Sequence, residues 1–244
     1  MFSKSAQYYD EIYASMDKDY AAEASKTHQL IQKYQHSRLM DKRSPGKSLL
    51  DVACGTGLHA DHLSKYYQVE GLDLDRQMLS VAKKKHPNIR FQQGDMTDFD
   101  LGRQFDAIVC LFSSIGYVKT KSRLQKAMRA MSRHLLPGGV LLVEPWFSPE
   151  QWHAGRAFMT QIDKPDLKIV RMSHSGQRGK ISLLEFQYLI GTAKGIDHQV
   201  EVHELGLFTH QEYLDTFKGT GLSVTHDPQG LDGRGLYIGT KAIK

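Results

Sequence analysis

Short apolar runs alternate with amphipathic stretches between residues 48 and 144. The runs that predict strands lie at 48–54, 68–74, 89–93, 105–112 and 139–144. Stretches in which apolar residues recur at helical spacing separate most of these runs, at 58–66, 77–85 and 122–136. Strands separated by helices predict a parallel sheet that is covered on both faces, in a doubly wound α/β fold.

The pattern differs on both sides of this region. Residues 5–36 read as helical and are rich in tyrosine. After residue 150, runs joined by glycine-containing turns are typical of an antiparallel meander, at 167–174, 181–190 and 198–208. A predicted helix at 209–218 then leads to two closing strands, at 222–226 and 235–242.

No repeat or low-complexity linker interrupts the chain, so we predict a single domain over residues 1–244. Its predicted parts are a helical N-terminal cap (1–43), an α/β core (44–150), an antiparallel β insertion (151–208) and a closing helix with two strands (209–244).

Composition places this domain among ordinary globular proteins. No apolar run is long enough for a signal peptide or a membrane span, and two cysteines cannot form a disulfide framework. We therefore expect a cytoplasmic protein with reduced thiols and no membrane partner. The net charge of +5 is compatible with a nucleic acid or a phosphorylated small molecule, so charge alone selects no partner.

The segment LLDVACGTG, at the end of the first predicted strand, carries the first functional signal. Gly55 and Gly57 allow positive φ and the close approach of a ligand, although a purely structural turn would use the same residues. Asp73 follows the second strand and is placed to accept hydrogen bonds from ribose hydroxyls. Asp95, in the GDM segment, is placed to accept from the exocyclic amine of adenine while Met96 packs on the ring. These strand ends predict a nucleoside site.

Two nucleoside ligands fit this spacing. A nicotinamide dinucleotide site would take a third glycine where Ala60 stands, and alanine is permitted there, so a dehydrogenase is not excluded by spacing. However, Asp51 immediately before the turn would repel a diphosphate and suits an α-ammonium group. S-adenosylmethionine combines a nucleoside, a sulfonium and an amino acid, and it is the cofactor that we predict. A plain turn role for Asp51 stays open.

The same motifs resemble those of the class I S-adenosylmethionine-dependent methyltransferases. The segments LFSSIG (111–116), VEPWFSPE (143–150), RMSHS (171–175) and GRGL (233–236) narrow the resemblance to bacterial dTDP-amino-sugar N,N-dimethyltransferases. The resemblance covers nearly the whole chain. It implies a Rossmann-like, seven-stranded sheet with the last strand antiparallel, a substrate entrance between cap and insertion, and a homodimer.

The resemblance also implies cofactor contacts beyond the turn. Tyr9 and Tyr20 of the cap would lie near the methionine part of the cofactor. The predicted cofactor-binding set is completed by Ala53, Leu74, Met78 and Phe112. The departures from the family lie on the substrate side, where Tyr117 replaces the histidine that follows SSIG and EPWW becomes EPWF.

Methyl transfer to an amine needs a collinear nucleophile, methyl and sulfur, and positioning of this kind can supply about 7–11 kcal/mol. Tyr117 and Glu144 are the candidate catalytic residues: Tyr117 would orient the amine, and Glu144 would accept a hydrogen bond from the substrate or cap local structure. Trp146 and Phe147 would form a pocket wall. An apolar pocket depresses the pKa of an amine, so a strong general base is optional.

A nucleotide sugar carries two phosphates, and three basic residues are candidates to bind them. Arg234 is the first candidate because guanidinium binds phosphate bidentately. Arg171 and His174 are further candidates, but strand alternation places them on opposite faces, so one of them is expected to contribute. His59 and His62 lie one helical turn apart without a third ligand at metal-binding spacing, so no metal is predicted.

The leading hypothesis is therefore an N-methyltransferase that acts on a small amine, with a nucleotide-linked amino sugar as the favoured acceptor. A nucleic-acid methyltransferase is disfavoured for two reasons. Methylases of base amines carry an N/D-P-P-Y/F segment after the fourth strand, where this chain reads LFSSIGY. Aromatic residues also do not interleave with basic residues, as they do in many nucleic-acid-binding proteins. Another small metabolite as acceptor, and a non-catalytic nucleoside-binding module, remain alternatives.

Overall fold

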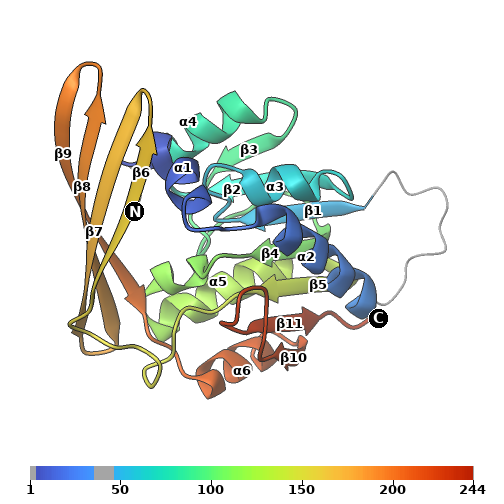
Figure 1. Ribbon diagram of the computed structural model, residues 1–244. Helices are drawn as coiled ribbons and strands as arrows, with labels where there is room; N and C mark the ends of the chain where they lie inside the picture. Colours follow the sequence, from blue (N-terminus) through green and yellow to red (C-terminus); the bar gives the residue numbers. More distant parts are fainter. Residues whose placement is uncertain (1–3, 36–46, 244) are drawn as a thin grey trace.

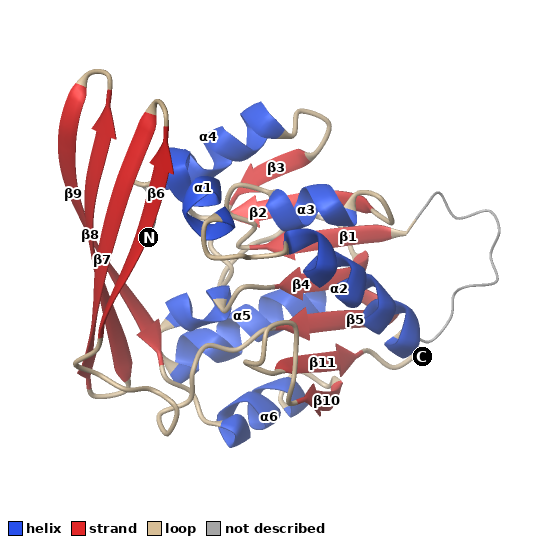
Figure 2. Ribbon diagram, in the orientation of Figure 1, coloured by secondary structure: helices blue, strands red, loops and turns tan. Residues whose placement is uncertain are grey.

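The computed structural model describes residues 4–35 and 47–243, which form two β-sheets with helices around the larger one (Figures 1 and 2). The larger sheet has seven strands in the order β10–β11–β5–β4–β1–β2–β3. These strands are β1 (Ser48–Val52), β2 (Gln68–Asp73), β3 (Arg90–Gln93), β4 (Phe105–Cys110), β5 (Leu135–Val143), β10 (Ser223–Asp227) and β11 (Leu236–Thr240). All neighbours from β5 to β3 pair in parallel, and the last strand, β11, pairs antiparallel with both β5 and β10, as predicted.

The helices cover both faces of this sheet. They are α1 (Tyr9–Ala14), α2 (Tyr20–Tyr34), α3 (Leu58–Leu63), α4 (Arg76–Lys85), α5 (Lys121–Arg133) and α6 (His210–Lys218), with short 3₁₀ helices η1 (Ala6–Tyr8) and η2 (Ser114–Val118). None of the helices in the described part of the chain is long and apolar enough to cross a membrane.

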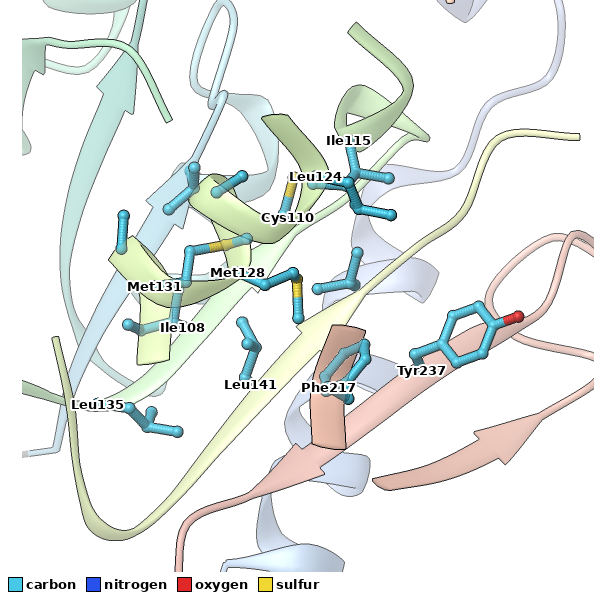
Figure 3. Close-up of a cluster of buried hydrophobic side chains, with 14 of the residues drawn as sticks. Ile108, Cys110, Ile115, Leu124, Met128, Met131, Leu135, Leu141, Phe217 and Tyr237 are labelled. Carbon is cyan, nitrogen blue, oxygen red and sulfur yellow. The ribbon is translucent and has the colours of Figure 1, made fainter. Parts of the chain in front are cut away.

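Alternation along β1 shows why the fold has two cores. Leu49 belongs to a buried cluster with Ile31 of α2 and Leu63 of α3, whereas Leu50 belongs to a second cluster with Met128 of α5. Figure 3 shows part of the second cluster, in which side chains of α5 and α6 pack on the sheet. Every residue of β1 is buried, as expected for a central strand covered on both faces.

The insertion is a separate four-stranded antiparallel sheet in the order β6–β7–β8–β9. Its strands are β6 (Ala157–Lys164), β7 (Leu167–Arg178), β8 (Ile181–Thr192) and β9 (Gly195–Gly206). Figure 1 shows this sheet standing beside α1, off the end of the larger sheet. The sequence predicted three of its strands and missed β6, an edge strand in which all but two residues are exposed, so it has little hydrophobic pattern.

Two helix boundaries differ from the prediction for identifiable reasons. The predicted helix 122–136 ends at Arg133, because Leu135 already pairs with Phe105 of β4. The predicted continuous helix 5–36 is broken before α2, where Asp17 has φ 57° and the Asp19 side chain accepts from the Ala22 N–H. Residues 36–46, including the last part of the predicted cap, lie outside the described residues.

Candidate active site

A cavity of about 720 Å³ lies between the larger sheet, the α1–α2 segment and the four-stranded sheet. Its volume is in the range of small-molecule sites. The turns that follow β1, β2 and β4 contribute to its wall, and β1 and β4 are neighbours in the sheet although they are distant in sequence. These turns lie at the carboxyl ends of the parallel strands, where open α/β sheets bind ligands.

The two predicted glycines of the first turn have different roles. Ala53 and Gly55 line the cavity with φ of 61° and 56°, and a Cβ added at Gly55 would meet no atom of the described part of the chain within 4 Å. Gly57 does not line the cavity: it starts α3 with φ 83°, and a Cβ there would lie 2.8 Å from the Phe91 ring. Gly55 therefore leaves space for a ligand, whereas the predicted cofactor contact of Gly57 is replaced by a packing role.

Asp73 lines the cavity and also fixes the turn. Its Oδ2 accepts from the Gly55 N–H and its Oδ1 from the Asp75 N–H, both at 2.8 Å. Burial raises the pKa of Asp73, although these hydrogen bonds oppose the shift. Each carboxylate oxygen can accept a further hydrogen bond, as a ribose diol would require. Leu74 and Met78 line the same part of the cavity.

Asp51 lies behind the cavity wall instead of in it. It is 2% exposed, and its Oδ2 has no hydrogen-bond partner within residues 4–35 and 47–243. Burial, reinforced by the charge of Asp73, raises the pKa of Asp51 to about 8. A buried acceptor without a partner next to the turn is costly in the free protein and suits a cationic ligand group.

Asp95 and Met96, which the sequence predicts to contact adenine, both line the cavity. Asp95 accepts from the Thr97 N–H and hydroxyl at 2.8 Å, and from the Arg123 guanidinium at 2.9 Å. Burial alone would raise the pKa of Asp95, but these donors outweigh it and the pKa is lowered. Arg123, which the sequence did not single out, thus adds to the two Thr97 donors that favour an ionised acceptor at the cavity wall.

The cap contributes aromatic side chains, but not both that were predicted. Tyr9 lines the cavity, with its ring centre 4.7 Å from that of Tyr13, a further lining residue. Tyr20 is 9% exposed and does not line the cavity; its ring packs edge-on against His59. The predicted cofactor contact of Tyr20 is thus replaced by a contact with α3.

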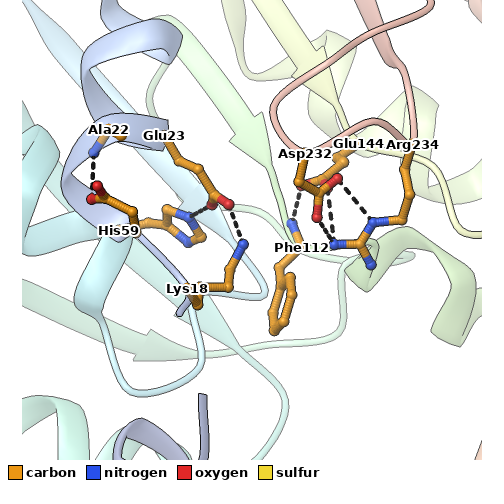
Figure 4. Close-up of polar contacts among 9 residues, drawn as sticks. Lys18, Ala22, Glu23, His59, Phe112, Glu144, Asp232 and Arg234 are labelled. Atoms are coloured by element: carbon orange, nitrogen blue, oxygen red, sulfur yellow. Dashed lines mark hydrogen bonds and ion pairs between the residues drawn. The ribbon is translucent and has the colours of Figure 1, made fainter. Parts of the chain in front are cut away.

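A buried polar cluster holds this part of the cap in place (Figure 4). Glu23 accepts from Lys18 and lies 2.7 Å from Nε2 of His59. Lys18 lies over the Phe112 ring at 4.1 Å and lines the cavity. His59 is therefore part of the attachment of the cap to α3.

Glu144 organises the turn after β4. It is fully buried, does not line the cavity, and its Oε2 accepts from the Phe112 N–H at 2.5 Å. The Arg234 guanidinium lies 3.4 Å from its Oε1 and also pairs with Asp232 through Nε at 3.0 Å (Figure 4). Burial raises the pKa of Glu144 to about 8 against the effect of Arg234. Direct contact of Glu144 with substrate, as predicted, does not fit this position; it supports Phe112, which lines the cavity with φ 51°.

The three basic residues predicted to bind substrate differ in whether they line the cavity and whether their charge is already paired. Arg234 lines the cavity but already pairs with the Asp232 carboxylate and lies against the buried Glu144 carboxyl group. Arg171 also lines it and is 5% exposed. Among the described residues it forms no ion pair, and its Nε and Nη1 have no hydrogen-bond partner there. Its guanidinium lies over the rings of Tyr13 at 5.5 Å and Phe186 at 4.9 Å. His174 is exposed on the opposite face of β7, outside the cavity.

Tyr117 and Trp146 line the cavity, as does Phe147, and Trp146 packs against Phe147 at 4.8 Å. The Tyr117 hydroxyl lies 2.7 Å from Nδ1 of His203, another lining residue. The sequence did not single out Phe186 or His203. Both side chains lie on the face of the four-stranded sheet that is turned to the cavity. Sequence alternation shows that each strand has two faces, but only the packing of the sheet against the cap shows which face is turned to the cavity.

The cavity thus has two parts, a donor half and an acceptor half. The donor half comprises Ala53, Gly55, Asp73, Asp95 and Met96. The acceptor half comprises Tyr117, Trp146, Arg171, Phe186 and His203. The open space at Gly55, the free acceptor positions of Asp73 and the unpartnered carboxylate of Asp51 fit the nucleoside and the α-ammonium group of S-adenosylmethionine.

Comparison with known proteins gives the same assignment. Residues 49–139 match the methyltransferase domain family. The chain is 39% identical over 98% of its length, and 91% of the relative, to dTDP-3-amino-3,6-dideoxy-alpha-D-glucopyranose N,N-dimethyltransferase of Streptomyces fradiae. The crystal structure of DesVI from Streptomyces venezuelae superposes with a TM-score of 0.89 at 39% identity, covering 98% of both chains.

A second solved structure is that of CalS10 from Micromonospora echinaspora, an amino pentose methyltransferase with S-adenosylmethionine bound. It has a TM-score of 0.84 and 34% identity, and the match covers 96% of both chains. The chain thus belongs to the family of S-adenosylmethionine-dependent sugar N-methyltransferases that includes the dTDP-amino-sugar N,N-dimethyltransferases, and it is an enzyme with S-adenosylmethionine as its cofactor.

Proposed function

We propose that the enzyme methylates the amino group of a dTDP-linked amino sugar. The observation that carries this acceptor is Arg171, a buried cation in the acceptor half without a carboxylate partner among the described residues. An unpaired buried charge is costly, so its retention is best explained by an anionic ligand group. A sugar diphosphate supplies such a group, as in the substrates that the relatives' names give.

Two other features support a small acceptor that reacts at nitrogen. Bound S-adenosylmethionine supplies an electrophilic methyl group on its sulfonium. Tyr117 offers a hydroxyl that can orient an amine, and Trp146 with Phe147 supplies an apolar wall that excludes water. Exclusion of water lowers the pKa of an amine and so favours its nucleophilic, neutral form.

The test is a panel of acceptors incubated with the purified enzyme and S-adenosylmethionine, read by product mass. The panel contains dTDP sugars with an amine at different ring positions, the same sugars without the nucleotide, simple amines, and a transfer RNA. We expect one or two added methyl groups on a dTDP-amino sugar only. Turnover of the free amino sugars at equal efficiency would contradict the proposed diphosphate contact, and turnover of RNA alone would contradict the proposed class of acceptor.

We also propose that the enzyme is a cytoplasmic homodimer. Cys54 and Cys110 are free and buried, which suits a reducing compartment. The face of the four-stranded sheet turned away from the cavity exposes apolar side chains, namely Met159, Met172, Leu189 and Val202. Sedimentation of the wild type and of a Leu189→Glu variant tests the dimer: we expect a dimer that the variant dissociates, and a wild-type monomer would contradict it.

A further inference from the structure

Two side chains of the acceptor half form a hydrogen-bonded pair that the resemblance does not predict. Tyr117 lies in η2, directly after β4, and His203 lies on β9, eighty-six residues further along the chain. The Tyr117 hydroxyl and Nδ1 of His203 are 2.7 Å apart, and both residues line the cavity. His203 is 1% exposed, so its imidazole reaches the cavity behind the tyrosine and not from solvent.

We propose that His203 is the proton acceptor for the substrate amine, with the Tyr117 hydroxyl as the relay between them. This inference rests on the proposed function, because it assumes that the acceptor nitrogen lies against Tyr117. It differs from a positioning role for Tyr117 alone, because it assigns the proton a destination.

Glu201 determines which nitrogen of the His203 imidazole can accept a proton. Its Oε2 lies 3.7 Å from Nε2 of His203, within ion-pair range. The same carboxylate accepts from the Lys4 N–H, from the Ser5 N–H and, at 2.7 Å, from the Ser5 hydroxyl. A carboxylate facing Nε2 favours the tautomer with its proton on Nε2, which leaves Nδ1 free to accept from Tyr117.

The protonation states of the three groups agree with this direction. Burial lowers the pKa of His203, against the effect of Glu201, so the imidazole is neutral near pH 7. Burial alone would raise the pKa of Glu201, but hydrogen bonds from His203 and Ser5 outweigh burial and lower this pKa to about 2, so the carboxylate is ionised. Burial raises the pKa of Tyr117, so the relay is a neutral phenol and not a phenolate.

The charges around the imidazole come from several elements. Glu201 on β9 favours the imidazolium, whereas Arg171 on β7 disfavours it. Phe186 on β8 packs against the ring at 5.0 Å and excludes water. Arg171 also disfavours a charged amine nearby, so it opposes the proton on both groups, and Glu201 is the charge that favours the proton on His203.

The proton transfer balances without any further reactant. The ammonium N–H bond breaks as a lone pair of the Tyr117 oxygen takes the proton. The original Tyr117 proton moves at the same time to Nδ1 of His203, and the electron pair of the broken N–H bond stays on the nitrogen, which becomes the nucleophile. The product is a neutral amine, an unchanged phenol and an imidazolium opposite Glu201.

The first experiment needs no substrate. We expect the ¹⁵N spectrum of His203, assigned by comparison with a His203→Gln variant, to show the Nε2–H tautomer with Nδ1 as hydrogen-bond acceptor near pH 7. In Tyr117→Phe the Nδ1 signal should move toward that of a free acceptor. An Nδ1–H tautomer, or an imidazolium at this pH, would overturn the relay whatever the acceptor of the enzyme is.

The second experiment separates a proton acceptor from a structural residue. We expect His203→Gln and Tyr117→Phe to lower kcat at pH 7 by about 100-fold, the low end of the contribution of general acid–base catalysis. The deficit should shrink as the pH rises, because the neutral amine then forms in solution without the relay. Binding of S-adenosylmethionine should be unchanged.

His198→Gln is the matched control, because His198 lies exposed on the same strand. We expect wild-type kinetics for it. A deficit of His203→Gln that stays constant with pH, or appears in KM alone, would overturn the relay. A wild type that methylates no amine in the acceptor panel would instead overturn the proposed function, and the imidazole spectrum keeps the two failures apart.

Discussion

The donor half and the acceptor half of the cavity are built in opposite ways. The donor half comes from turns that directly follow β1, β2 and β3, so each of its residues is a few positions from a strong strand signal. The acceptor half joins η2 and the loop after β5 to β7, β8 and β9, over ranges far apart in the chain. The predicted cofactor site is therefore local in sequence, whereas the predicted acceptor site depends on how the four-stranded sheet packs.

The sharpest way to separate the two halves is to fill the space at Gly55. We expect Gly55→Val to weaken binding of S-adenosylmethionine by at least about 100-fold, or about 2.7 kcal/mol, because the added side chain occupies the open cradle. Calorimetric titration measures this effect. Gly179→Val is the matched control: Gly179 has φ 60°, close to the 56° of Gly55, but lies in the turn between β7 and β8. Equal losses of binding in both variants would mean that backbone strain, not the cradle, is responsible.

Asp51→Asn tests whether the carboxylate behind the turn recognises the ammonium group. We expect binding of S-adenosylmethionine to weaken by about 10- to 150-fold, which corresponds to the 1.5–3 kcal/mol of a hydrogen bond to a charged group. Titration of the cofactor measures it, and exposed Asp166→Asn is the control. Unchanged affinity would leave Asp51 as a structural residue of β1.

The same variant should gain stability in the absence of ligand. Since the pKa of Asp51 is raised to about 8, the folded chain holds a proton that the unfolded chain releases, and wild-type stability falls as the pH rises from about 4 to about 8. Asparagine cannot ionise. We therefore expect the advantage of Asp51→Asn in denaturant unfolding to grow across this window, and a constant difference would contradict the raised pKa.

The sequence predicted the sheet and most of the donor half because both depend on local pattern. Strand periodicity predicts β1, its glycine turn and the positions of Asp73 and Asp95 at the ends of the next strands. Because the carboxyl ends of parallel strands lie on the same side of a sheet, these residues are expected to lie close together. The sequence assigns Gly57 to the cofactor because glycine permits positive φ and the close approach of a ligand, and only the position of Phe91 shows that Gly57 serves packing.

The acceptor half was predicted less well because its contacts are not local. Alternation placed Arg171 and His174 on opposite faces of β7, but only packing against Tyr13 of the cap identifies the inner face. The sequence favours Arg234 for phosphate because guanidinium binds phosphate bidentately, and only the structure shows that Asp232 pairs with it and that Glu144 lies beside it. The place of His203 in the cavity could be predicted only with the register of β9 and the contact of β9 with η2.

Arg171→Met tests the acceptor half while leaving the donor half intact. If Arg171 binds the diphosphate, we expect KM for a dTDP-amino sugar to rise about 10-fold, equivalent to about 1.4 kcal/mol, with unchanged affinity for S-adenosylmethionine. Steady-state kinetics and cofactor titration measure the two effects. Arg156→Met, at an exposed arginine just before β6, is the control. A loss of cofactor affinity in Arg171→Met would mean that the two halves are not independent.

Arg123→Met has the smallest expected effect, because the Arg123 side chain is 47% exposed. The substitution removes one donor to Asp95 but leaves both donors of Thr97, so the carboxylate stays ionised at neutral pH. An exposed ion pair contributes about 0.2–1 kcal/mol, so we expect affinity for S-adenosylmethionine to fall by at most about 5-fold, and less at high salt, where the pair is screened. Cofactor titration at low and high salt measures this, with exposed Arg129→Met on the same helix as control. A tenfold or larger loss would mean that Arg123 contacts the cofactor itself, and the donor half would then extend beyond the strand-end turns into α5.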